Sequence, residues 1–93
     1  MLKNKKLKLI EGKFLHDEAK EILRNIFSAK INFHQMKNFS SQERFGKDDK
    51  TAVKKIPILK KELVKLDKIL AEAKAKNLNL VITSEINILL SAD

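Results

Sequence analysis

The sequence has no cysteine, no tyrosine and no tryptophan, and it contains only two glycines and one proline. Without cysteine the chain can form neither disulfides nor a thiolate metal site. Its glycines, Gly12 and Gly46, are too far apart for a glycine-rich phosphate-binding loop. No window approaches the roughly 18–20 apolar residues of a membrane span. These absences predict a cytosolic protein without a membrane-spanning segment, a cofactor or a metal centre.

Positive charge is in excess and unevenly placed. The 93 residues carry 20 Lys and Arg against 12 Asp and Glu, a net charge of +8, and only Arg24 and Arg44 are arginine. Most of the basic residues lie in residues 1–13 and 46–76, whereas residues 77–93 contain none. Such blocks indicate one basic surface, which nucleic acid or an acidic protein could bind. Genome composition can also enrich a chain in lysine, so charge alone does not establish that partner.

Apolar residues recur at alternating intervals of four and three in the first half of the chain. They are Leu15, Ala19, Ile22, Ile26, Ala29, Phe33 and Met36. This period is typical of an amphipathic α-helix, and Leu23 and Phe27 widen its apolar face. We therefore predict a helix over residues 15–37 with this stripe in the core.

A second stripe with the same spacing follows a polar break. Its members are Ala52, Ile56, Leu59, Leu63, Leu66, Leu70 and Ala73. Pro57 has no amide hydrogen and disfavours helical backbone at Ile56. We predict a helix over residues 50–76 with a kink, or its true start, near Pro57.

The break itself, residues 38–49, contains signals for helix ends. Ser40 and Glu43 have the spacing of a capping box and predict a short extra turn. Gly46 suits the position just after a helix, where the backbone turns left-handed. Three residues could cap the next helix: Asp48, Asp49 and Thr51.

Both ends of the chain alternate apolar and polar residues, which is the pattern of a half-buried strand. Residues 78–90 (LNLVITSEINILL) are rich in β-branched side chains, and residues 6–14 predict a shorter strand. Gly12 marks a bulge or a close approach in the shorter strand. In the strand predicted over residues 6–14, alternation places Leu7 and Leu9 on one face and Ile10 and Phe14 on the opposite face.

The order strand, helix, helix, strand predicts a single α+β domain over residues 1–93. A long antiparallel helical hairpin would pack on a two-stranded antiparallel sheet. Because such a sheet has two unprotected edges, we expect a homodimer to complete it to four strands.

One polar cluster lies at and beyond the end of the first predicted helix: Asn32, His34, Lys37, Glu43 and Arg44. His34 could be a general acid or base if Glu43 or Asp48 oriented it. Alternatively, His34 is an ordinary surface residue and Glu43 a helix cap. Neither His34 nor His16 has metal-ligand spacing.

Five lysines near the N-terminus are the strongest indication of a ligand: Lys3, Lys5, Lys6, Lys8 and Lys13. In a strand, Lys6 and Lys8 share one face, where they could contact phosphates. The alternative is that lysines on an edge strand discourage aggregation. Phe33, Phe39 and Phe45 could similarly stack on unpaired bases or pack in the core.

The stretch INFHQMKNFSSQERFGKDD, with the arrangement from EGKFLHDEAKEIL to the closing strand, resembles a small bacterial protein family of unknown function. The resemblance covers most of the chain and implies no activity and no site residues.

The sequence has the apolar pattern of a hydrophobic core, but it contains no recognisable set of catalytic residues. We therefore predict a non-enzymatic interaction or structural module that acts as a cytosolic homodimer. The alternatives are a nucleic-acid-binding accessory protein that uses the lysine-rich face, and a small enzyme centred on His34.

Overall fold

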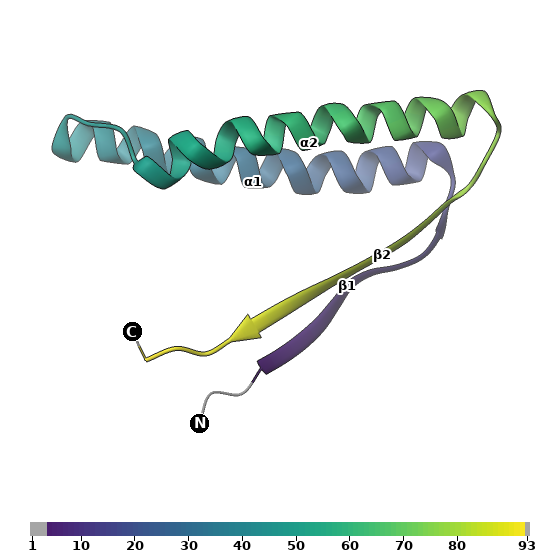
Figure 1. Cartoon of the computed structure of the whole chain (residues 1–93), viewed down its shortest axis with the longest axis horizontal. Helices are drawn as coiled ribbons and strands as arrows, with labels where there is room; N and C mark the ends of the chain where they lie inside the picture. The colour runs from purple at the N-terminus through teal and green to yellow at the C-terminus, as the bar shows by residue number, and fades with distance from the viewer. Residues whose placement is uncertain (1–3, 93) are drawn as a thin grey trace.

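The computed structural model describes residues 4–92, in the order β1 (Asn4–Phe14), α1 (His16–Phe45), α2 (Lys50–Ala75) and β2 (Leu80–Leu89). Figure 1 shows the two helices side by side as an antiparallel hairpin and the two strands as a ribbon. The ribbon starts at one end of the hairpin and diverges from it, so the molecule has the shape of a V (Figure 1). We call its two halves the hairpin arm and the ribbon arm. The predicted α+β class and element order are confirmed.

The ribbon is antiparallel, as predicted, and its register runs from Phe14 opposite Leu80 to Asn4 opposite Leu89. The register shifts between Lys8 and Ile10, where Leu9 is the extra residue of a β-bulge. The bulge reverses the alternation in β1. The predicted separation of Leu7 from Ile10 was therefore wrong, because both now lie on the same face.

The two faces of the ribbon differ in chemistry, since residues opposite each other in the register share a face. We call the side that packs on the hairpin at the closed end of the V the inner face. Its apolar members are Leu7, Ile10, Phe14, Leu80, Ile82, Ile86 and Ile88. The outer face is mostly polar and consists of Asn4, Lys6, Lys8, Glu11, Lys13, Val81, Thr83, Glu85, Asn87 and Leu89. Burial away from water would therefore stabilise the inner face and not the outer face.

The helix α1 continues to Phe45 instead of ending at residue 37, and the separate turn predicted from Ser40 and Glu43 does not form. Polar residues of its last turns bond the following turn, which explains why they interrupt the apolar pattern. Asn38 Oδ1 accepts the Asp49 amide at 2.8 Å, Ser41 Oγ donates to the Lys47 carbonyl at 2.9 Å, and Gln42 Nε2 donates to Asp48 Oδ1 at 2.7 Å. Gly46 ends the helix as predicted, with φ 65° and its amide donating to the Gln42 carbonyl.

The helix α2 runs through Pro57 without interruption, so this proline is not the start of the helix. Pro57 cannot donate to the Val53 carbonyl four residues earlier, which leaves that acceptor without its helical partner. Of the three candidate caps, Asp49 is the one used, since its side chain accepts the Ala52 amide at 2.8 Å.

Replacing Asp49 by alanine should lower the free energy of unfolding by about 1 kcal/mol, because the Ala52 amide loses its acceptor at the start of α2. Urea unfolding followed by circular dichroism at fixed protein concentration measures this. Asp48→Ala is the matched control, and we expect a change below about 0.5 kcal/mol because the bond that Asp48 accepts comes from the exposed side chain of Gln42. Equal losses in the two variants would contradict the assigned cap.

The core lies at the closed end of the V. Ala19, Leu66 and Leu70 form its buried centre, and the half-buried side chains around it are Phe14, Leu23, Phe27, Leu63, Leu80 and Ile82. The stripe predicted for α2 is confirmed, with Ala52, Leu59, Leu66, Leu70 and Ala73 all buried. The stripe predicted for α1 is right for Ala19, which is buried, and for Ile22, which is half-buried, and wrong for its other members, which are exposed. Leu23 and Phe27, which were expected to widen the apolar face, do pack against the core, and the helix buries Ile31 and His34 in place of Ile26, Phe33 and Met36.

Candidate interaction surface

The polar cluster predicted near the end of α1 is divided between different surroundings. His34 is only 9% exposed and lies edge-on to the Phe33 ring, with 5.4 Å between ring centroids. Within residues 4–92, no hydrogen bond or ion pair joins His34 to Glu43 or Asp48. The arrangement that acid–base chemistry at His34 requires is therefore not assembled in this structure.

Lys37 and Arg44, in contrast, lie together beside exposed apolar side chains. The Lys37 Nζ is 5.6 Å from the Phe33 ring centroid, a cation–π distance. A shallow hollow on α1 is lined by Phe33, Met36, Lys37, Ser40 and Arg44. Asn32 and Glu43 are exposed but do not line this hollow. This part of α1 offers an apolar surface with a basic border.

The lysines of β1 do not form a single cluster. Lys6, Lys8 and Lys13 lie on the outer face, whereas Lys5 lies on the inner face opposite Ile88. Lys3 lies outside the described residues. The outer face also carries carboxylates, because Glu11 accepts from Lys8 Nζ at 3.0 Å and Glu85 lies opposite Lys8 in the register. These acids reduce the positive charge available to a nucleic acid.

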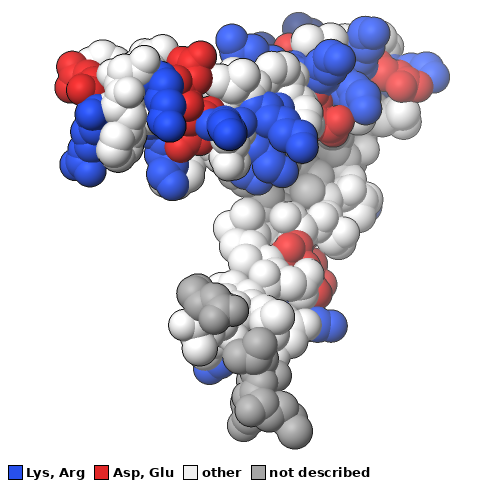
Figure 2. All heavy atoms as spheres, turned by 60° about the vertical axis from the view of Figure 1, so that its left-hand side comes forward, with Lys and Arg blue, Asp and Glu red and all other residues white. Residues whose placement is uncertain are grey.

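Most of the charge seen in Figure 2 covers the hairpin arm, where blue and red residues are mixed, while the ribbon arm is largely white. Several ion pairs lie on the hairpin, including one between Arg24 of α1 and Asp67 of α2. Glu62 pairs with Lys65 within α2, and Glu72 pairs with Lys76 just after the helix ends. Exposed pairs of this kind contribute about 0–1 kcal/mol each. They make the hairpin surface charged without forming a uniformly basic patch.

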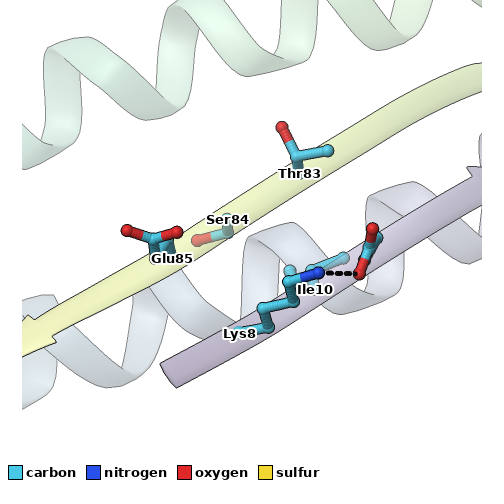
Figure 3. A pocket seen from close by; sticks show the side chains of 6 residues that line it. Lys8, Ile10, Thr83, Ser84 and Glu85 are labelled. Carbon is cyan, nitrogen blue, oxygen red and sulfur yellow. Dashed lines mark hydrogen bonds and ion pairs between the residues drawn. The ribbon is translucent and has the colours of Figure 1, made fainter. Parts of the chain in front are cut away.

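A hollow at the bulge of the ribbon, of about 270 Å³, is lined by Lys8, Ile10, Glu11, Thr83, Ser84 and Glu85 (Figure 3). Lys8 is engaged with Glu11 at its rim. The lining contains no histidine, and its two carboxylates, Glu11 and Glu85, lie near the hydroxyls of Thr83 and Ser84 at this open surface. Within residues 4–92, no group of three or more His, Asp or Glu side chains could hold a metal ion.

The exposed apolar side chains give the more informative surface. On the ribbon arm, the inner face continues beyond the core as Leu7, Ile86 and Ile88, all exposed, with Ile86 at 39%. On the hairpin arm, the uncovered stripe of α1 includes Ile26, Phe33 at 56% and Met36 at 60%. We call these two sets the ribbon wall (Leu7, Ile86, Ile88) and the hairpin wall (Ile26, Phe33, Met36).

An open groove connects the two arms near the closed end of the V. Leu23, Leu66 and Ile69 line it from the hairpin, and residues 79–83 line it from the ribbon. The hairpin wall lies about a third of a turn of α1 away from the buried stripe of the same helix. Sequence reasoning missed both walls. The hairpin wall could have been inferred from the width of the apolar face of α1. With Leu23 and Phe27, this face is too broad to be covered by a single neighbouring helix.

The chain exposes far more surface than a compact domain. Its accessible area is 7747 Å², whereas a compact monomer of 10.7 kDa exposes about 5,500 Å². The Cα radius of gyration is 16.8 Å, against about 12 Å for a compact chain of this length. The extents of 50 × 37 × 15 Å show a flat and open molecule. About 2,200 Å² of surface is thus in excess of what a compact domain exposes.

A comparison of the chain with protein-family models, curated proteins and solved structures finds no match. Among residues 4–92, no helix is both long enough and apolar enough to cross a membrane. The surface chemistry of the chain itself therefore carries the functional argument.

Proposed function

We propose that this protein is a non-enzymatic interaction module that acts as a homodimer. The observation that carries the proposal is the exposure of grouped apolar side chains on both arms, the ribbon wall and the hairpin wall. Contiguous apolar surface of this kind usually marks an interface, because its hydration is unfavourable.

The amount of surplus surface fits a permanent interface. Permanent dimers bury about 1,000–2,500 Å² on each partner, and the excess here is about 2,200 Å² per chain. Every copy of the protein is accompanied by further copies of the same chain. Self-association can therefore bury the two apolar walls without any other protein. Closed twofold symmetry also limits the assembly to two chains.

The two alternatives have less support from the described residues. Nucleic-acid binding relies on Lys6, Lys8 and Lys13, which share the outer face with Glu11 and Glu85. An enzyme centred on His34 needs a carboxylate partner that this histidine does not have in the structure. Neither alternative explains why both arms carry grouped, exposed apolar side chains.

Gel filtration with light scattering tests the proposal. At micromolar concentration the protein should have twice the 10.7 kDa mass of one chain. The dimer should persist in about 1 M salt, because apolar burial is not screened, whereas binding through phosphates would weaken steeply. A monomeric mass at micromolar concentration would contradict the proposal.

A further inference from the structure

We infer that the dimer forms through the free edge of β2, which pairs with β2 of a second copy across a twofold axis. The resulting four-stranded sheet has the order β1–β2–β2–β1, and the ribbon wall of each copy packs on the hairpin wall of the other. This inference rests on the proposed homodimer and specifies its interface.

The two edges of the ribbon are not equally protected. The strand β1 carries Lys5, Lys6, Lys8 and Lys13 and contains the bulge, and both features discourage pairing with another strand. The strand β2 carries a single charged residue, Glu85, and has neither lysine nor proline. Of the two free edges in the described sheet, β2 is therefore the one suited to accept another strand.

Charge supports the same choice. A twofold axis places the same segment on both sides of the interface. Two copies of β1 would bring their lysines together at a sheet edge, and like charges directly opposite each other are destabilising. Two copies of β2 would bring together LVITSEINIL, in which β-branched residues favour sheet pairing. Pairing around the axis is necessarily antiparallel when the axis is perpendicular to the sheet.

The side chains above the sheet fit this arrangement. Because the arms diverge, the ribbon wall of one chain is not covered by the hairpin of the same chain (Figure 1). A four-stranded sheet extends across the open V of each partner and places apolar Ile86 and Ile88 near the exposed Phe33 and Met36 of the other copy. The polar outer face, with Lys6 and Lys8, stays in water. Apolar walls are then buried on both arms at once.

Single cysteines test the edge assignment, since the chain has no native thiol. Thr83→Cys, Glu85→Cys and Asn87→Cys place a thiol on the outer face of β2. Lys6→Cys, Lys8→Cys and Lys13→Cys are matched controls on the same face of β1. Under oxidation or with a short bismaleimide, at least one β2 variant should form a covalent dimer, because diagonal neighbours across paired strands are about 7–8 Å apart. The β1 variants should stay uncross-linked.

The outcomes separate this inference from the proposed homodimer. Cross-linking through β1 instead of β2 would overturn the edge assignment. A dimeric mass by light scattering with no cross-link in either set would overturn strand pairing and favour packing through α1, while the homodimer would stand. A monomeric mass for the unsubstituted protein would overturn both. Circular dichroism of each variant confirms that these exposed substitutions leave the fold intact.

Discussion

Replacing Leu70 by alanine should lower the free energy of unfolding by about 3–5 kcal/mol. Leu70 is 3% exposed and contacts Ala19 and Leu66 at the closed end of the V. The same cluster is where Leu80 packs against the hairpin, so the resulting cavity weakens the contact between the arms as well as that between the helices. A domain of this size has a total stability of only about 5–14 kcal/mol. The substitution should therefore remove a large share of it.

Urea unfolding at a fixed protein concentration, followed by circular dichroism, measures this loss. Val64→Ala is the matched control, because Val64 lies on the same helix, is exposed and takes no part in the buried cluster. Alanine is also the better helix former, so this control should change the stability by less than about 0.5 kcal/mol. A loss at Leu70 no larger than that at Val64 would show that the core is not where we place it.

Some elements could be predicted from the sequence because local and tertiary requirements agree. In α2, leucines at helical spacing alternate with lysines and glutamates, so one face is available for burial and that face is the buried one. In β2, alternation alone separated the inner from the outer residues. Gly46 and Asp49 ended and started helices through local backbone chemistry, which sequence patterns express directly.

Other features depend on partners that a sequence pattern does not name. The helix α1 has two apolar stripes, and only the position of α2 decides that Phe27 is covered while Phe33 is not. The end of α1 was misplaced because Asn38 and Gln42 look like loop residues, yet their polar groups bond the turn that follows. The bulge at Leu9 has no distinctive residue, since β-bulges need not contain glycine.

The candidate interaction surface was unpredictable for the same reason. Ile86 and Ile88 have the pattern of core residues, and within one chain they belong to the face that should be buried. The divergence of the two arms leaves them uncovered, which follows from the geometry at the closed end of the V and not from any local motif. The homodimer expected from the sheet edges and the apolar walls seen in the structure are independent arguments for the same interface.

Replacing Ile86 by lysine should weaken dimerisation by about two orders of magnitude or more. In the proposed dimer this side chain is enclosed between the sheet and the partner's hairpin wall, and an unpaired charge placed there loses its hydration without gaining a counter-ion. In a single chain the position is 39% exposed, so the lysine can reach water and the helical hairpin keeps its fold. Sedimentation equilibrium over a dilution series measures the shift in Kd.

Asn4→Lys is the control that separates charge from position. Asn4 lies on the outer face of β1, opposite Leu89, so a lysine there stays in solvent and away from the β2 edge that is proposed to pair. We expect this variant to remain a dimer with nearly unchanged Kd and an unchanged circular dichroism spectrum. Equal weakening by both lysines would indicate general charge repulsion between chains. Leu70→Ala acts on the fold of each chain and should change the free energy of unfolding, whereas Ile86→Lys acts on association and should change the Kd of the dimer. If Ile86→Lys left that Kd unchanged, the ribbon wall would not be the dimer interface.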